Sequence, residues 1–204
     1  MIRQIALAAW FVLAPLPLYA ATYTLESDYT QGIVRWNHLG FSTPVAQFGS
    51  GQGTLEFDPA NPTKSSVSVT IPLASLNTGV PDLDEEFRST FFFETAKYPT
   101  ATFKSTRVEA GQMPGHLQVS GELSLHGVTK PLKLDVTVLK VGTNPRTNLP
   151  TVGFAATATL LRSDFGLGKF VPQVADEIQL QITAQGAEAK AYADYLKQQA
   201  AEKK

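Results

Sequence analysis

Apolar and polar residues alternate with a period of two in four segments of the chain. In residues 116–126, Leu117, Val119, Leu123 and Leu125 share one face, and the residues that alternate with them, mostly polar, share the other. Such alternation is typical of antiparallel strands that bury one face and expose the other. The four segments are residues 66–71, 116–126, 132–138 and 177–184.

Five less regular apolar segments predict further strands, which brings the expected number to eight or nine. Turn-forming sequences rich in Gly, Pro and Asn separate several of them, and many strands at short spacing favour a sandwich or a barrel. In the segment Val45–Phe57, glycines at 49, 51 and 53 permit the sharp bend that a barrel corner requires. The five segments are Thr22–Glu26, Gly32–Leu39, Val45–Phe57, Ala101–Glu109 and Thr151–Arg162.

Two segments depart from the strand pattern and predict helices. Pro81–Ser89 begins with proline and acidic residues, as helix N-termini prefer. Leu83 and Phe87 are four residues apart there, so they share a helix face. Residues 187–204 contain no Gly or Pro and are rich in good helix formers. We expect this tail to be an amphipathic helix that rests on the outside of the sheet.

A cluster of phenylalanines follows the first predicted helix. Phe91, Phe92 and Phe93 are consecutive, and Phe87 stands four residues before Phe91. A strand would expose alternate rings, because successive side chains point to opposite faces, and a helix would spread the rings around its circumference. Either the protein's own packing or an apolar ligand must therefore cover them, and the sequence leaves both open.

Residues 1–20 have the parts of a secretory signal peptide. Arg3 supplies the positive start, an apolar stretch follows, and Ala20 is a small residue suited to cleavage. An uncleaved membrane anchor is the alternative. Pro15 and Pro17 interrupt the apolar run, which is also short for a bilayer span. We therefore expect export to a bacterial periplasm, with no stable membrane anchor after cleavage.

The rest of the chain shows no linker, internal repeat or low-complexity segment. We expect one domain over residues 21–186, followed by the helical tail at 187–204. Such a domain has enough chain to bury a substantial hydrophobic core.

Charge and composition exclude several classes of function. Without Arg3, 16 basic residues face 18 acidic ones, a net charge of −2, and the one basic run is the short Lys203–Lys204 end. Nothing in this pattern attracts nucleic acid. The chain contains no Cys, which excludes disulfides, thiolate metal sites and thiol catalysis. No nucleophile elbow or phosphate-binding glycine loop is present.

The residues that could carry chemistry do not form a recognisable catalytic or metal-binding set. His38, His116 and His126 lie far apart and lack the spacing of metal ligands. Arg162 ends an apolar strand, and Asp164 stands in the turn that follows. Such a pair either fixes a loop at the mouth of a barrel or contacts a polar head group. The sequence favours the first and leaves the second open.

The order and spacing of several motifs resemble the YceI-like family of periplasmic, lipocalin-like proteins that bind polyisoprenoids. The similarity runs from about Thr22 to Ala184. No single motif is decisive, but together they are specific. They are RWNHLGFS (35–42), GTLEFDP (53–59), SLNTG (75–79), YPTATFKST (98–106), GELSLHGVTKPL (121–132), RSDFG (162–166) and VADEIQLQI (174–182).

The resemblance implies an all-β fold, an eight-stranded antiparallel lipocalin-like barrel with an extended apolar tunnel. It makes the insert around Asp82–Phe93 a short helical cap. It also implies a long-chain isoprenoid or related amphiphile as ligand, with a quinone as one candidate, no other cofactor, and a homodimer as a common assembly.

The cap departs from the family's pattern in several places. Asp84 and Arg88 are retained, whereas Glu86, Phe87 and Thr90 stand where the family often has His, Leu and Asp. The cap is therefore more apolar than usual. The resemblance implies a tunnel more firmly than it implies a particular head group.

These observations favour a binding protein without catalytic residues or a metal. One alternative is a structural or stress-response module with a barrel filled by its own side chains. Another is an enzyme acting on a lipophilic substrate. Ordinary core packing explains any single ring at least as well as ligand contact does. The expected aromatic lining is Trp36, Phe41, Phe48, Phe57, Phe87, Phe91, Phe92, Phe103 and Phe165, and the candidate polar contacts are His38, Asp84, Arg88, Arg162 and Asp164.

Overall fold

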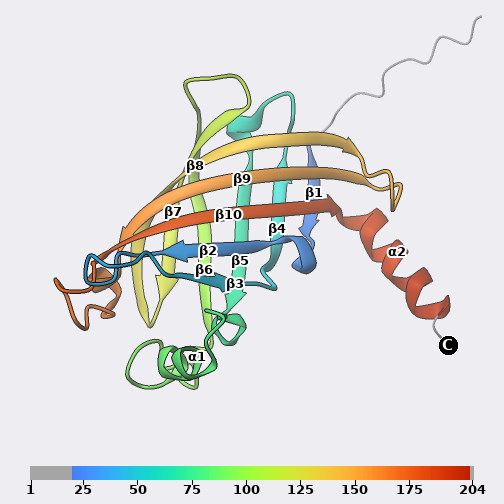
Figure 1. Cartoon of the computed structure of the whole chain (residues 1–204). Coiled ribbons are helices and arrows are strands. Elements are labelled where there is room, and N and C mark those ends of the chain that lie inside the picture. Colours follow the sequence, from blue (N-terminus) through green and yellow to red (C-terminus); the bar gives the residue numbers. More distant parts are fainter. Residues whose placement is uncertain (1–19, 203–204) are drawn as a thin grey trace, which may run out of the picture.

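The alternating segments form the wall of a closed antiparallel barrel. The computed structural model describes residues 20–202, and Figure 1 shows the strands curving around a common interior. Eight strands pair in the order β1-β4-β5-β6-β7-β8-β9-β10, and pairing between β1 and β10 closes the barrel. This confirms the all-β, eight-stranded barrel expected from the sequence.

Most neighbours in the barrel are also neighbours in sequence, as in a meander. From β4 to β10 each strand pairs with the next by an antiparallel ladder. The strands are β1 (Ala21–Leu25), β2 (Gln31–Arg35), β3 (Val45–Phe48), β4 (Gln52–Phe57), β5 (Ser66–Pro72), β6 (Thr100–Ala110), β7 (His116–Leu125), β8 (Val128–Thr143), β9 (Pro150–Leu161) and β10 (Glu177–Glu188).

Strands β2 and β3 extend the wall beyond the closed ring. β10 is long enough to pair with β1 near its C-terminal end and with β2 near its N-terminal end. β2 in turn pairs with β3. At this end of the barrel β3 does not continue the β4–β5 ladder, and a backbone bridge joins Gln47 to Asn77 instead. The wall therefore splays open here.

Two expected strands are shorter than the sequence suggested. The segment Val45–Phe57 is two strands, because Ser50 has a positive φ of 56° and breaks the ladder between β3 and β4. The Gly51 amide donates to the carbonyl of Thr30, so this break lies beside the one between β1 and β2. The segment Gly32–Leu39 ends at Arg35, because the chain turns at Leu39, where φ is 58°.

The barrel interior is apolar, as the alternation predicts. The inward face of β7 and β8 is buried, with Leu117, Val119, Leu132 and Leu134 each below 10 % exposed. They belong to a core cluster that includes Phe103, Phe165 and Leu167. A second cluster, around Phe57 and Val152, lies at the end of the barrel away from the splayed end. A third, which contains Trp36 and Leu76, lies at the splayed end itself.

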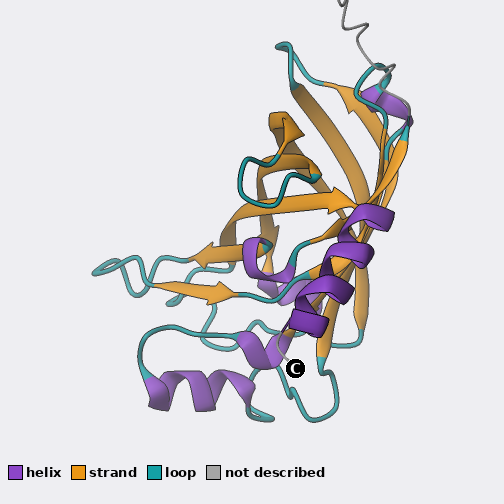
Figure 2. Cartoon of the chain, turned by 90° about the vertical axis from the view of Figure 1, so that its right-hand side faces the viewer, coloured by secondary structure: helices purple, strands orange, loops and turns teal. Residues whose placement is uncertain are grey.

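Both expected helices are present. α1 (Pro81–Arg88) lies beneath the splayed end of the barrel, and α2 (Ala189–Glu202) leads directly out of β10 and away from the wall (Figure 1, Figure 2). α2 contacts the barrel mainly through β1 and β10, and Leu196 is 48 % exposed. The tail therefore rests on the sheet over part of its length. Short 3₁₀ turns are η1 (Ser27–Tyr29), η2 (Pro62–Lys64), η3 (Leu73–Ser75) and η4 (Arg162–Phe165).

The expected signal peptide lies outside the described residues, apart from Ala20. Within residues 20–202, no helix is both long and apolar enough to cross a lipid bilayer.

Candidate apolar binding cavity

The inward-facing side chains leave a cavity of about 530 Å³ inside the barrel. Ligand sites in proteins commonly measure about 300–1,000 Å³ and are lined mainly by apolar and aromatic groups. The cavity fits both criteria. Its wall consists of the alternate apolar residues that the sequence places on one face of each strand, including Val67, Val69, Leu180 and Ile182.

Aromatic packing closes the inner end of the cavity. Phe57 is 2 % exposed, and its ring meets Phe154 edge-on at a centroid distance of 5.4 Å. Tyr23 packs against Phe57 from the other side at 6.4 Å. Val152 is fully buried in the same cluster. The Phe57 ring therefore lies between the cavity and a filled part of the barrel.

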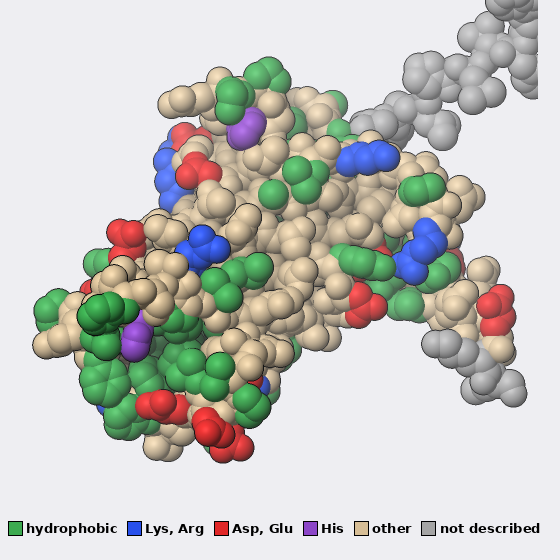
Figure 3. Space-filling model, viewed as in Figure 1, with side chains coloured by type: hydrophobic (Ala, Val, Ile, Leu, Met, Phe, Trp, Pro, Cys, Tyr) green, Lys and Arg blue, Asp and Glu red, His purple; other side chains and the backbone are tan. Residues whose placement is uncertain are grey.

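The opposite end is the mouth of the cavity. Apart from Ser66, the exposed residues of the lining all lie there: His38, Glu86, Lys169 and Phe170. They come from three separate segments, namely the β2–β3 loop, helix α1 and the loop before β10. Figure 3 shows hydrophobic side chains gathered over this end of the molecule.

Helix α1 and the turn that follows it cover the mouth with aromatic rings. Phe87 packs against Trp36 at a centroid distance of 5.8 Å and against Phe92 at 5.0 Å. Phe93 points further in and meets Phe48 at 5.9 Å. Four of these rings (Phe48, Phe87, Phe92 and Phe93) and the Trp36 indole belong to the cavity lining. Packing within the protein therefore covers part of the phenylalanine cluster, and Phe87, Phe92 and Phe93 also face the cavity.

The remaining ring of the cluster, that of Phe91, faces outward. Phe91 is 43 % exposed and lies outside the lining. It contacts Phe92 at 5.4 Å and Phe170 at 6.0 Å, and the Lys169 ammonium lies 2.9 Å from its ring centroid. Phe91 therefore supports the cap from the solvent side.

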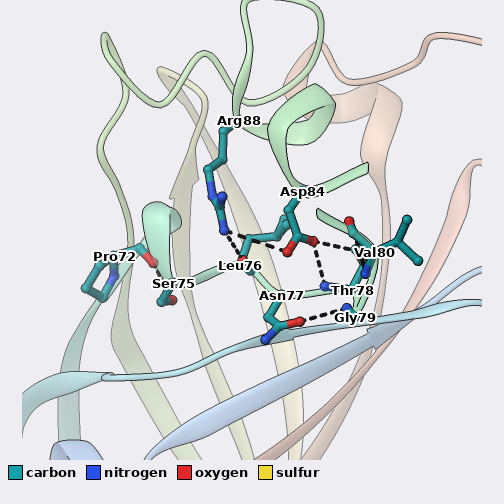
Figure 4. A network of polar contacts seen from close by, with 9 residues as sticks. All are labelled: Pro72, Ser75, Leu76, Asn77, Thr78, Gly79, Val80, Asp84 and Arg88. Atoms are coloured by element: carbon teal, nitrogen blue, oxygen red, sulfur yellow. Dashed lines mark hydrogen bonds and ion pairs between the residues drawn. The ribbon is translucent and has the colours of Figure 1, made fainter. Parts of the chain in front are cut away.

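A polar network fixes α1 to the loop before it (Figure 4). The Asp84 carboxylate accepts a hydrogen bond from the Thr78 amide at 2.7 Å and from its hydroxyl at 2.6 Å. These bonds, together with the nearby Arg88 guanidinium, lower the pKa of Asp84 below its usual value. Arg88 donates to the carbonyl of Leu76 and lies 3.9 Å from Asp84. Both side chains therefore anchor the cap and do not line the cavity.

Arg162 fixes the loop on the other side of the mouth. Its guanidinium donates to the carbonyls of Ala175 at 2.9 Å, Lys169 at 2.8 Å and Val174 at 3.0 Å, and also to that of Leu167. Burial lowers the pKa of Arg162. Arg162 therefore fixes the loop, as the sequence favoured. Its partners are backbone carbonyl groups, whereas the sequence suggested Asp164.

The acidic residue that holds this loop by hydrogen bonds is Asp176, not Asp164. Asp176 accepts hydrogen bonds from the amide of Ser163 at 2.8 Å and from its hydroxyl at 2.6 Å. Asp164 is exposed and forms no ion pair with Arg162 among residues 20–202. The pairing expected from the sequence was therefore wrong, because the chain folds back and brings an acid from twelve residues further on.

The structure divides the fourteen candidate residues into two groups. One group lines the cavity and the other does not. Phe41 is 91 % exposed at a loop tip, whereas Phe165 is buried in the core beside the cavity. The lining group is Trp36, His38, Phe48, Phe57, Phe87, Phe92, Phe103 and Arg162, and the other group is Phe41, Asp84, Arg88, Phe91, Asp164 and Phe165.

Several residues of the mouth were missed by sequence reasoning. Lys169 and Phe170 lie in an irregular loop, where no periodicity reports the direction of a side chain. Leu83 could have been found, because it shares a helix face with Phe87. Thr30 falls between the first two expected strands, yet it lines the cavity and its hydroxyl is buried without a hydrogen-bond partner.

No group of three or more His, Cys, Asp or Glu side chains within residues 20–202 is arranged to hold a metal ion. His38 lies at the mouth. The His116 imidazole is hydrogen-bonded to the Thr137 hydroxyl, and the His126 imidazole is hydrogen-bonded to the Phe165 carbonyl. The three imidazoles thus stay apart in space as they do in the sequence.

A closed eight-stranded antiparallel barrel around an apolar cavity, with a helix over its mouth, defines the class of lipocalin-like barrels. The chain belongs to the YceI-like family, since residues 23–186 match the YceI-like domain. A UPF0312 protein of Shewanella baltica is 32 % identical over 183 residues, which cover 89 % of this chain and 95 % of the relative.

Solved structures show the same fold. The crystal structure of Burkholderia cenocepacia BcnA superposes with a TM-score of 0.68 at 24 % identity, over 76 % of this chain and 95 % of that one. A polyisoprenoid binding domain from Saccharophagus degradans, implicated in plant cell wall breakdown, superposes with a TM-score of 0.64 at 18 % identity, over 83 % and 99 %. At these identities the likeness establishes the fold.

Proposed function

We propose that this protein is a periplasmic, non-catalytic binding protein that holds an isoprenoid or similar long-chain amphiphile in its barrel. Transport, storage or sequestration of that ligand is its role, and a quinone is one candidate ligand. The observation that carries the proposal is the apolar cavity of about 530 Å³, closed at one end and capped at the other by aromatic rings.

The energetics of such a cavity favour binding without catalysis. Burial of apolar surface contributes about 25 cal/mol per Å². A hydrocarbon chain inside the barrel would bury surface on the ligand and on the wall together. The polyisoprenoid binding domain from Saccharophagus degradans shares this fold, which supports an isoprenoid as the chemical class of the ligand.

The alternative of a side-chain-filled barrel acting through its surface receives less support. Side chains pack in clusters along the barrel, but they leave a cavity of about 530 Å³ between them. An enzyme on a lipophilic substrate would need a nucleophile activated by a neighbouring base, and no side-chain hydrogen bond joins two such groups among the described residues of the lining. The proposal therefore names no catalytic residue.

Native mass spectrometry tests the proposal directly. Protein from the periplasm, purified without detergent, should carry a stoichiometric extra mass that extracts into solvent as an isoprenoid or related amphiphile. A clean apo mass that does not change after incubation with polyprenols and quinones would refute the proposal. N-terminal sequencing of the same sample checks cleavage after Ala20, and its fractionation checks the periplasmic location.

Homodimerisation belongs to the same proposal and rests on the family resemblance. Light scattering coupled to size-exclusion chromatography measures it, with and without extracted lipid.

A further inference from the structure

The charged side chains of the cavity lining are confined to its mouth. Among the described residues of the lining, Glu86, Arg162 and Lys169 carry formal charges, and all three lie at the end covered by α1. His38 lies beside them. The inner wall offers only apolar groups and a few neutral polar ones. A ligand with one charged end would therefore place that end at the mouth.

Arg162 brings a positive charge to this mouth, and the nearby Asp176 carboxylate offsets part of it. Within residues 20–202 it forms no ion pair, and its hydrogen-bond partners are the four carbonyl groups described above. Carbonyl dipoles satisfy the guanidinium donors, but they carry no net charge. Because the group is partly buried, water screens its field less than at an open surface.

Lys169 adds a second positive charge on the same loop. Its ammonium lies over the Phe91 ring and forms no ion pair among the described residues. An ammonium has three N–H donors, and one aromatic face does not use them all. The Lys169 backbone carbonyl accepts a hydrogen bond from Arg162, so both residues belong to the same side of the mouth.

Glu86 is the single acidic residue of the lining. It is exposed, so its charge is well screened. The lining itself therefore carries two cations and one carboxylate, and Asp176 lies near Arg162 outside the lining.

We infer that the ligand is an amphiphile with an anionic head group, a carboxylate or a phosphate, which the Lys169 ammonium binds at the cavity mouth. Arg162 supports this contact through its field, and the apolar chain extends toward Phe57. The inference rests on the proposed function, because it concerns the head group of the ligand that the cavity holds. It gives a reason for the loop before β10 to place a cation beside the aromatic rings of the cap.

Two pairs of probes test it, each matched in chain and different in head group. One pair is geranylgeranyl monophosphate with geranylgeraniol, and the other is oleate with oleyl alcohol, all kept below their aggregation concentrations. Trp36 lines the cavity, so its fluorescence reports occupancy. At low salt the anionic member of at least one pair should bind about three- to tenfold more tightly than the alcohol. Raising the salt to about 0.5 M should reduce that advantage.

Charge-neutralising variants locate the contact. Lys169→Gln should remove the preference for the anion over the matched alcohol. The Lys169 carbonyl that Arg162 bonds belongs to the backbone and is retained. Glu86→Gln should increase the preference for the anion by about two- to threefold. The control is Lys104→Gln, which removes a positive charge from the outer face of β6, away from the cavity, and should change neither affinity.

The outcomes separate the inference from the proposed function. If every member of both pairs binds with equal affinity, the head-group inference is wrong and the binding function stands. If Lys169→Gln and Lys104→Gln weaken anion binding equally, the preference is a general charge effect and the inference is also wrong. If no probe and no quinone binds to the folded protein, both proposals fail. Preference within one pair alone identifies the head group as phosphate or carboxylate.

Discussion

The ring of Phe87 on helix α1 packs edge-on against the indole of Trp36, with 5.8 Å between the ring centroids. Trp36 belongs to the splayed end of the barrel wall, so this contact joins the cap to the wall. The two side chains also line the cavity. Cap position and cavity shape are therefore coupled through one aromatic pair, and several consequences can be measured.

Introducing a charge into this pair should weaken ligand retention. We expect Phe87→Asp to reduce co-purifying lipid at least about tenfold, since a buried carboxylate beside apolar rings costs several kcal/mol. The barrel should stay folded, because its strands do not depend on α1. Solvent extraction and mass analysis measure the lipid, and circular dichroism checks the fold. Phe41→Asp is the matched control, because Phe41 is 91 % exposed and outside the lining. Equal lipid content in both variants would mean that α1 does not retain the ligand.

Arg162 should contribute strongly to stability through its bonds to carbonyl groups. We expect Arg162→Gln to lower the free energy of unfolding by about 2–4 kcal/mol, because several partly buried carbonyls lose a charged donor. Urea denaturation measures this change. Limited proteolysis should show new cleavage in the loop before β10. Arg107→Gln removes an exposed partner of Glu109 and should cost less than about 1 kcal/mol. Similar losses in both variants would contradict this account of the loop.

Thr30 should be a site where removing a hydroxyl stabilises the protein. Its Oγ1 is buried without a hydrogen-bond partner, and an unsatisfied buried polar group costs about 1–3 kcal/mol. We expect Thr30→Val, which keeps the shape, to raise the free energy of unfolding by about 1 kcal/mol. Thr102→Val on the exposed face of β6 should change it by less than about 0.5 kcal/mol. A loss of stability in Thr30→Val, measured by urea denaturation of delipidated protein, would show that the hydroxyl has a partner.

Asp84 should make the stability of the cap depend on pH. The pKa of Asp84 in the folded protein is lowered by its hydrogen bonds from Thr78 and by Arg88. A lowered pKa means that the stabilisation is present above the unfolded-state pKa of about 3.9 and is lost as the pH falls through the folded value. Asp84→Asn should therefore lower the melting temperature at pH 7, and its difference from the wild type should shrink toward pH 2.5.

The control for this pH profile is Asp82→Asn on the same helix. The Asp82 side chain is exposed, and no hydrogen bond to it occurs among the described contacts. The melting temperature of the Asp82→Asn variant should change with pH in the same way as that of the wild type. A difference between Asp84→Asn and wild type that stays constant from pH 7 to pH 2.5 would show that ionisation of Asp84 is not what stabilises the cap.

The barrel wall was predictable because burial in an antiparallel sheet follows strict alternation. Leu132, Leu134 and Val136 were placed on one face from sequence, and each is buried. The helix over Pro81–Ser89 was predictable from its proline and acidic start, and the structure ends it one residue earlier. Local rules were sufficient in these segments because each residue's environment repeats along the element.

The breaks in the wall were not predictable from alternation. The segment Val45–Phe57 reads as one strand, yet Ser50 and Gly51 interrupt it where the neighbouring segment also breaks at Thr30. The reason is pairing between segments distant in sequence. A break in one strand leaves backbone groups that only a matching break in the next strand can satisfy.

The roles of Asp84, Arg88 and Arg162 show a similar limit. The sequence marked all three as candidate polar contacts, and only Arg162 reaches the cavity lining. Asp84 and Arg88 turn back onto the loop that precedes α1. Residue type indicates that a side chain will seek a polar partner, but the folded backbone decides whether that partner is protein or ligand.

The sequence by itself determined which residues form the barrel wall and which face of each strand is apolar, because a period of two is a local property of an extended chain. It also determined that four phenylalanines would need cover. Only the tertiary structure decided that three of them face a cavity while Phe91 faces outward. It likewise brought Lys169 to the same mouth as Glu86. These arrangements depend on how loops from distant segments meet, and no local pattern encodes that meeting.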